Sequence, residues 1–98
     1  MMTVLKCYFE GAEVHVCSDS GTDIIVFGYN HYQALCHRLG CTFDLQPTSR
    51  PAFAANGSPM IFAGKTKMKV ASNHASGLYD FYVQKQFMKG NPLLSEHY

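Results

Sequence analysis

The chain has no apolar stretch long enough to cross a bilayer and no segment arranged like a secretory signal. Its first residues, Met1 to Lys6, lack the order of a charged region followed by an apolar one. No run approaches the roughly 20 apolar residues that a transmembrane helix needs. Four cysteines without a signal segment favour reduced thiols. We therefore expect a cytoplasmic protein without a membrane partner.

Charge is also scarce, since charged residues make up 15% of the chain and the net charge is +1. Apolar residues make up 47%, which is far from a disordered composition. A chain of 98 residues with this composition predicts a single domain over 1–98 with a modest core.

The few charges divide unevenly between the two halves. Residues 1–49 carry two basic and five acidic side chains, whereas residues 50–98 carry six basic and two acidic ones. A basic half is one signal of nucleic-acid binding. However, Lys65, Lys67 and Lys69 alternate with apolar residues, which is the pattern of a strand that protects an exposed sheet edge with lysines. We therefore regard nucleic acid as the less favoured partner, which salt-sensitive binding through these lysines would reveal.

The feature around which the chain is organised is an Asp-Ser-Gly tripeptide between two apolar runs. Residues 14–18 form a strand-like run that leads to Asp19, and residues 24–27 form an unbroken apolar run that we expect to be buried on both faces. Gly21 lets the backbone pass close to its neighbours, and Ser20 can hydrogen-bond in the turn. The sequence thus predicts a carboxylate held at a tight turn between two strands.

The alternation before Asp19 predicts a β-hairpin. Apolar and polar residues alternate over 5–10 and again over 14–17. A two-residue type II′ turn at Gly11-Ala12 would pair Phe9 with Val14. It would also pair Cys7 with Val16, which places the apolar residues on one face.

A short helix is predicted after the second apolar run, with Asn30 as its N-cap. Four residues share an inward stripe at helical spacing. They are Tyr32, Leu35, Cys36 and Leu39. Gly40 should end the helix in the left-handed conformation and bring Cys41 back against Cys36. The alternation over 41–46 then predicts a short strand.

Asn56-Gly57 is the strongest two-residue hairpin signal in the chain. A hairpin folded about it would oppose Phe53 to Met60 and Ala52 to Ile61. Its tip, residues 54–58, has small side chains and a glycine, so that it is free to move as a lid does. An ordinary surface hairpin would have the same pattern.

The last third of the chain reads as strand, loop, strand and an apolar pair. Residues 73–77 predict a loop, and residues 78–87 favour a strand. The expected inward face of that strand holds Tyr79, Phe81, Val83 and Phe87. A turn over 90–92 then leads to Leu93-Leu94.

Taken in order, four blocks resemble the retroviral-type (retropepsin-like) aspartic proteases, above all the gypsy-like LTR-retrotransposon branch. Residues 19–23, Asp-Ser-Gly-Thr-Asp, are similar to the family's Asp-Ser/Thr-Gly-Ala-Asp, and the apolar run and short helix that follow are common in the retrotransposon branch. Residues 54–59, with Gly64-Lys65 behind them, look like the flap hairpin and its return strand. Residues 80–83 and 90–94 resemble the strand and apolar pair that close the sheet under the active site. The resemblance implies a mainly β, closed barrel or sandwich with one short helix, a flap and half a site per chain.

The resemblance also implies a chemistry. A homodimeric aspartic endopeptidase would bring two copies of Asp19 together, and the pair would share one proton. The substrates would be extended peptides of a retroelement polyprotein, cleaved in the cytoplasm or within retroelement particles. Ser20, Gly21 and Thr22 would support the active loop. The substrate-binding residues would be Gly21, Asp23, Ala55, Asn56 and Gly57. Neither a metal nor a cofactor is implied.

Departures from the family pattern leave a second hypothesis open. Cys17-Ser18 precede Asp19 where the family usually has aliphatic residues, Thr22 replaces alanine, and Ser95 stands where the family has glycine. The sequence ends at Tyr98, about where a C-terminal helix and last strand would begin, so we expect these two elements to be short or missing. The alternative is a catalytically weak or inactive dimerisation or protein-binding module of the same fold.

Other arrangements of reactive residues are less favoured. Gly64-Lys65-Thr66 ends like a phosphate loop, but Pro59 occupies the position that needs the first glycine. Cys36, His37 and Cys41 lack a second pair at ligand spacing, so core cysteines are the preferred interpretation. The histidines form no pattern, and any Ser-His-Asp triad would be an arbitrary choice.

Overall fold

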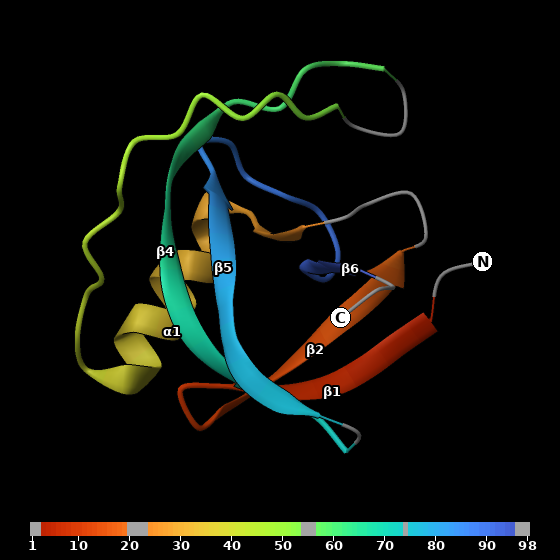
Figure 1. Ribbon diagram of the computed structural model, residues 1–98, viewed down its shortest axis with the longest axis vertical. Helices are drawn as coiled ribbons and strands as arrows, with labels where there is room; N and C mark the ends of the chain where they lie inside the picture. Colours follow the sequence, from red (N-terminus) through yellow and green to blue (C-terminus); the bar gives the residue numbers. More distant parts are fainter. Residues whose placement is uncertain (1–2, 20–23, 54–56, 74, 96–98) are drawn as a thin grey trace.

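Short apolar runs separated by glycine-bearing turns give a mainly β architecture (Figure 1). The computed structural model describes residues 3–19, 24–53, 57–73 and 75–95. The elements in these ranges are β1 (Thr3–Phe9), β2 (Ala12–Asp19), β3 (Ile25–Phe27), α1 (Tyr29–Leu39), β4 (Phe62–Ala71), β5 (Ser76–Gln84) and β6 (Leu93–Ser95). The prediction of a mainly β fold with a short helix is confirmed.

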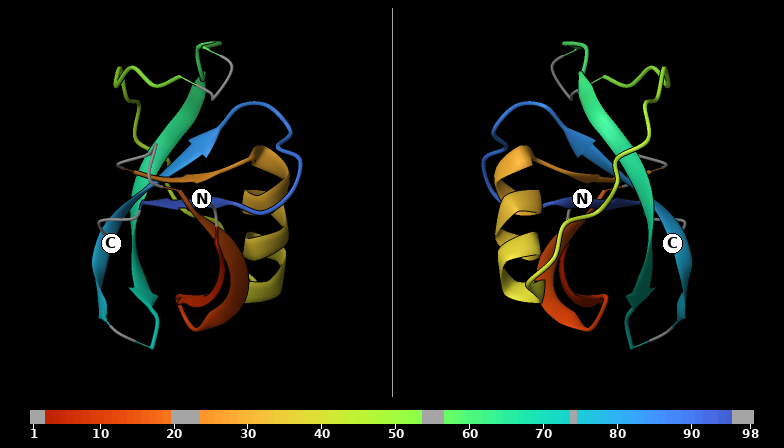
Figure 2. Two further views of the ribbon diagram at one scale, coloured as in Figure 1. Left: turned by 90° about the vertical axis from the view of Figure 1, so that its right-hand side faces the viewer. Right: turned by 90° about the vertical axis from the view of Figure 1, so that its left-hand side faces the viewer.

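The strands pair in the order β1-β2-β6-β3-β5-β4, and β1 also pairs with β4 through Tyr8 and Phe9, which closes the ring. The short strand β6 lies between β2 and β3, parallel to β2 and antiparallel to β3. The helix lies along the outside of the barrel, against β2, β3 and β5 (Figure 2). Among the described residues, no helix is long and apolar enough to cross a membrane.

Three phenylalanines form the centre of the main core. Phe9, Phe27 and Phe81 are buried, and their ring centroids lie 4.4–5.9 Å apart. Such tilted and edge-on contacts add to the apolar burial of about 1.5–3 kcal/mol per side chain. All three residues of β3 are buried. Ile25 and Phe27 face this core, and Val26 faces a second, smaller one. The predicted burial of both faces of this strand is confirmed.

The β1–β2 hairpin forms, but its predicted register is wrong by two residues. Phe9 pairs with Ala12 and Cys7 with Val14, and the turn is Glu10-Gly11. Both turn residues have positive φ, 51° and 88°, as a type I′ turn requires. The conformation of Glu10 is supported by β4, because its N–H donates to the carbonyl of Lys69 and its carboxylate accepts from the N–H of Lys69 at 2.6 Å. A shift of two leaves every side chain on its face, so alternation could not choose between these registers.

The helix begins one residue after Gly28, which is its N-cap, so the assignment of Asn30 as the cap is wrong. At the other end, Gly40 adopts the predicted left-handed conformation with φ 71°, and the N–H of Cys41 donates to the carbonyl of Cys36. The inward stripe is also confirmed, with Tyr32, Leu35 and Cys36 buried and Leu39 packed at its margin.

The strand predicted over 41–46 is absent, although Phe43 and Leu45 turn inward as its alternation implied. The hydroxyl of Tyr32 substitutes for a neighbouring strand, because it donates to the carbonyl of Phe43 and accepts from its N–H. Burial is the main cause that raises the pKa of Tyr32 above its usual value. Gln46 alone pairs with a strand, through two backbone hydrogen bonds with Lys65.

Two further expectations in the C-terminal half are corrected. Ser76 and Gly77 belong to β5 rather than to the preceding loop, and Phe87 lies beyond the strand and is exposed. The lysine-bearing strand β4 pairs with β5 along its length, but its other side pairs with β1 only at Val70 and Ala71 and with Gln46 at Lys65, so most of that side is an edge as predicted.

Candidate functional site

Asp19 is the last residue of β2, where the strand-like run was predicted to deliver it. The β2–β6 register places the Cα atom of Asp19 opposite that of Ser95. The next described residues, Ile24 and then β3, lie on the other side of β6. The backbone that enters the predicted turn and the backbone that leaves it are therefore held together by a third strand, which is a rigid base for a reactive group.

Most of the other predicted site residues lie outside the described residues. These are Ser20, Gly21, Thr22, Asp23, Ala55 and Asn56. Gly57 is described, is exposed and has a φ of +86°, the conformation that a glycine in a tight turn supplies.

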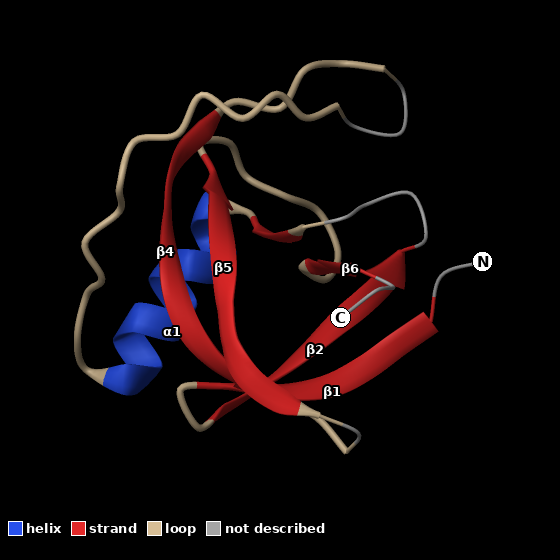
Figure 3. Cartoon of the chain, in the orientation of Figure 1, coloured by secondary structure: helices blue, strands red, loops and turns tan. Residues whose placement is uncertain are grey.

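The predicted flap corresponds to an arm made of residues 52–53 and 57–60. One bridge joins Phe53 to Pro59, and the N–H of Met60 donates to the carbonyl of Ala52 at 2.9 Å. The predicted pairing of Phe53 with Met60 is thus wrong by one residue, which a short and mostly exposed pairing specifies only weakly. Figure 3 shows the arm extending over the top of the molecule toward the side on which β2 ends.

The second core anchors the base of this arm to the strands beside Asp19. Tyr82, Ile24 and Val26 are buried together, and Ala52 and Met60 of the arm pack against them. Leu93 of β6 belongs to the same cluster. The base of the arm and the strands β3 and β6 are therefore joined through one set of packed side chains.

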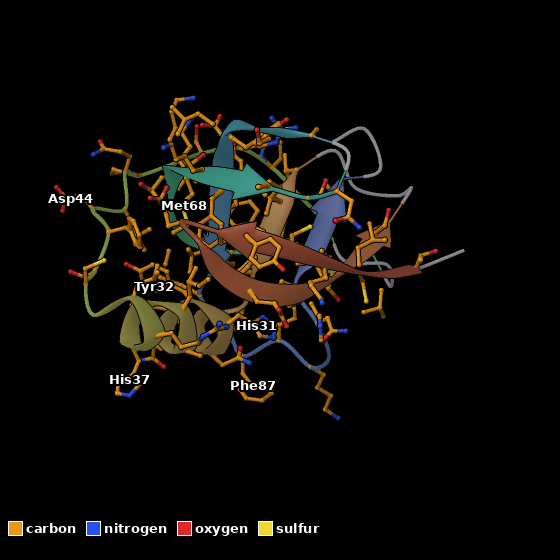
Figure 4. The ribbon with its side chains drawn as sticks, turned by 90° about the horizontal axis from the view of Figure 1, so that it is seen from below. His31, Tyr32, His37, Asp44, Met68 and Phe87 are labelled. Carbon is orange, nitrogen blue, oxygen red and sulfur yellow. The ribbon has the colours of Figure 1, made fainter. Side chains whose placement is uncertain are left out.

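Sequence reasoning missed a second group of residues, at the start of α1. The Asn30 side chain bonds with the backbone of Met88, and the His31 ring with the carbonyl of Gly90 at 2.8 Å. In Figure 4, His31 lies at the end of α1 nearest the segment that precedes β6, whereas His37 points away from the barrel. The only sequence signal was two polar residues in the first helical turn, and Asn30 was interpreted there as a cap.

A hollow of about 300 Å³ lies between α1, β2 and residues 90–92. Its apolar floor includes Leu35 and Pro92, and its rim carries Glu13 and Arg38. The Arg38 guanidinium donates to the carbonyl of Glu13, so the rim joins the helix to β2. Neither Asp19 nor Ile24 lines this hollow, which was not predicted.

The lysines of β4 are partly neutralised by the neighbouring strand. The carboxylate of Asp80 lies 3.2 Å from the ammonium group of Lys67 and 3.9 Å from that of Lys65. Within the described ranges, no three His, Cys, Asp or Glu side chains are grouped so as to hold a metal ion.

Comparison with solved structures identifies the fold. The chain superposes on EIAV protease, solved in complex with the inhibitor HBY-793, with a TM-score of 0.74 and 13% sequence identity, covering 99% of this chain and 84% of the protease. The chain has a retroviral-protease fold. No protein-family model matches the sequence, and no curated protein matches it. The predicted fold class is confirmed, while the likeness to this protease does not extend to the choice of the gypsy-like branch.

Proposed function

We propose that this chain, a single retropepsin-like domain over 1–98, is an aspartic endopeptidase that works as a homodimer, with one Asp19 from each copy. The observation that carries the proposal is the position of Asp-Ser-Gly. It begins at the last residue of β2, beside β6, in a chain that has the retroviral-protease fold over nearly its whole length. The proposed substrates are extended peptides, such as those of a retroelement polyprotein of the gypsy-like LTR type, cleaved in the cytoplasm or in retroelement particles.

The chemistry follows from two carboxyl groups in contact. Both cannot ionise at low free-energy cost, so the pair holds one proton. The ionised carboxylate removes a proton from a water molecule as that water attacks the peptide carbonyl carbon, and the protonated carboxyl donates its proton to the carbonyl oxygen. Collapse of the tetrahedral intermediate breaks the C–N bond, and the amine leaves with a proton from the pair.

The remaining predicted residues have supporting roles in this proposal. Ser20, Gly21 and Thr22 support the loop, with Ser20 linking the two copies, and Gly21 and Asp23 bind the extended peptide. The arm with Ala55, Asn56 and Gly57 pairs with the peptide as an added strand and excludes water. The coupling of the arm's base to β3 and β6 through Tyr82 supports this arrangement, because closure of the cover then acts on the strands that carry the carboxylates.

Replacement of the reacting carboxyl group tests the proposal directly. We expect Asp19→Asn to lower the cleavage of a peptide library by at least about 10²–10⁴-fold, since it removes the acid–base pair. Wild-type cleavage should be fastest in mild acid. The matched control is Asp44→Asn, which makes the same chemical change in the exposed segment beyond the helix (Figure 4). Equal cleavage by Asp19→Asn and wild-type dimers would refute the catalytic assignment, and sedimentation would establish the dimer.

A non-catalytic dimerisation or protein-binding module is the second candidate. It is favoured by Ser95, which the β2–β6 register sets opposite Asp19 where the family resemblance calls for glycine. This candidate predicts an intact dimer that neither cleaves peptides nor binds a statine-type inhibitor.

A further inference from the structure

The segment between β5 and β6 is held at every second residue. Residues 86, 88, 90 and 92 each present a backbone carbonyl that accepts a hydrogen bond. The four donors are the Tyr29 N–H at 3.1 Å, the Asn30 amide at 3.2 Å, the His31 ring at 2.8 Å and the Cys17 N–H at 2.7 Å. Three donors thus come from the first turn of α1 and the fourth from β2.

The segment curves as it passes the start of the helix, since the chain bends at residues 85–86 and 90–91 and Gly90 has a positive φ of 75°. The four hydrogen bonds follow this curve, so they hold segment 86–92 against the start of the helix and against β2. Asn30 completes this pairing, because its carbonyl oxygen also accepts the Met88 N–H at 2.9 Å, so that one side chain binds both backbone groups of Met88. The fit is close, since a Cβ atom at Gly28 would lie 2.4 Å from the Cβ atom of Met88.

The orientation of the His31 ring is fixed on three sides. Its Nδ1 atom accepts the Gly28 N–H at 3.1 Å, and its Nε2–H donates to the carbonyl of Gly90. The edge of the ring also packs on Phe27, with centroids 6.0 Å apart, which ties it to the main core. Because both of its ring nitrogens are hydrogen-bonded, the His31 side chain fixes the distance between the start of the helix and segment 86–92.

We propose that Asn30 and His31 are positioning residues of the candidate active site. They hold segment 86–92 in place, and so they set the register in which β6 enters between β2 and β3. That register places Ser95 opposite Asp19. The effect on catalysis rests on the proposed function, whereas the effect on β6 is a property of the fold and can be measured without it.

The test compares the double variant Asn30→Ala/His31→Ala with Gln33→Ala/His37→Ala, which truncates two exposed residues of the same helix. The readout is hydrogen exchange at the backbone amide of Cys17, which donates a hydrogen bond to the carbonyl of Pro92. The amides that pair β4 with β5 are the internal reference. We expect exchange at Cys17 to rise roughly tenfold or more in the first variant only, with the reference unchanged. Unchanged exchange at Cys17 would overturn the proposal.

A single substitution separates positioning from general loss of stability. Asn30→Asp keeps the oxygen that accepts the Met88 N–H and removes the amide donor. We expect it to restore part of the Cys17 protection that Asn30→Ala loses. Equal exchange in Asn30→Asp and Asn30→Ala would show that pairing with Met88 does not hold the segment.

Steady-state kinetics of the dimer test the effect of these residues on catalysis. With β6 displaced, kcat should fall roughly tenfold or more while KM changes by less than about threefold, because the reacting carboxyl group moves and the peptide-binding arm stays. An unchanged kcat beside faster Cys17 exchange would refute the catalytic part. A wild-type protein without peptidase activity would refute the proposed function instead, and Cys17 exchange would still decide the role of Asn30 and His31.

Discussion

Two hairpins of this molecule begin from the same local signal and have different structures. Gly11 and Gly57 have nearly equal φ angles of 88° and 86° at the two turns. The β1–β2 hairpin continues into seven paired positions, whereas the arm has a single bridge between Phe53 and Pro59. The first hairpin closes the barrel, and the second projects from it (Figure 1).

The difference lies in what each hairpin packs against. The β1–β2 hairpin buries Cys7 and Phe9 and is bonded to β4 at its turn, so tertiary contacts support its ladder. Among the described residues of the arm, Ala52 and Met60 at its base pack against the second core, while Phe53 is exposed. A turn signal therefore predicts where a chain reverses, and the buried contacts around it decide whether the hairpin becomes part of the barrel or projects from it.

The largest effect on stability should come from disrupting the centre of the main core, against which the β1–β2 hairpin packs. Phe81→Ala removes a ring that contacts Phe9 and Phe27 and is 0% exposed, and we expect it to lower the free energy of unfolding by about 3–5 kcal/mol. Phe53→Ala makes the same change on the arm, where the ring is 66% exposed, and should lower it by less than about 0.5 kcal/mol. Urea denaturation of both variants checks this, and comparable losses would show that the arm belongs to the cooperative core.

A smaller and more selective effect is expected at the two glycines. A Cβ atom would meet nothing within 4 Å at Gly11 or Gly57, so alanine introduces only backbone strain at positive φ, about 1–2 kcal/mol. We expect Gly11→Ala to lose this amount of stability, because seven pairs hold its turn in place. Gly57→Ala should lose less than about 0.5 kcal/mol, because the arm can relax. Thermal unfolding of the two variants decides, and a larger loss for Gly57→Ala would show that the arm is held more firmly than the β1–β2 hairpin.

The smallest perturbation is labelling of the thiols in the native protein. Cys7 is 0% exposed, and burial raises the pKa of its thiol, so both access and the thiolate fraction are low at pH 8. Cys41 is exposed just after the helix. We expect a maleimide to modify Cys41 within minutes, and to modify Cys7 only as fast as the main core unfolds. Mass spectrometry of peptides would measure both rates. Rapid labelling of Cys7 would indicate that the main core opens locally.

The sequence was most informative where one physical signal dominates. Unbroken apolarity identified β3, helical spacing identified the inward face of α1, and Gly40 marked the end of that helix. The delivery of Asp19 by a strand also follows from alternation alone. The wider fold came from the order of four individually weak blocks, which together resembled one family.

The errors arose where distant residues decide the structure. The register of β1–β2 depends on contacts between Glu10 and Lys69, and the segment after α1 is held by the Tyr32 hydroxyl in place of a strand partner. Asn30 has the side chain of a cap, but it binds Met88, 58 residues away in sequence. Local propensity contains no information about a hydrogen-bond partner that lies far away in the sequence and comes near only when the chain folds.

The four hydrogen bonds from α1 and β2 limit how the length of segment 86–92 can change. Because the segment bends at residues 85–86 and 90–91, deleting or inserting a residue between 86 and 92 would move the carbonyls that follow it away from their donors on α1 and β2. We therefore expect natural or engineered length variation in this connection to be harmful, whether by one residue or by two.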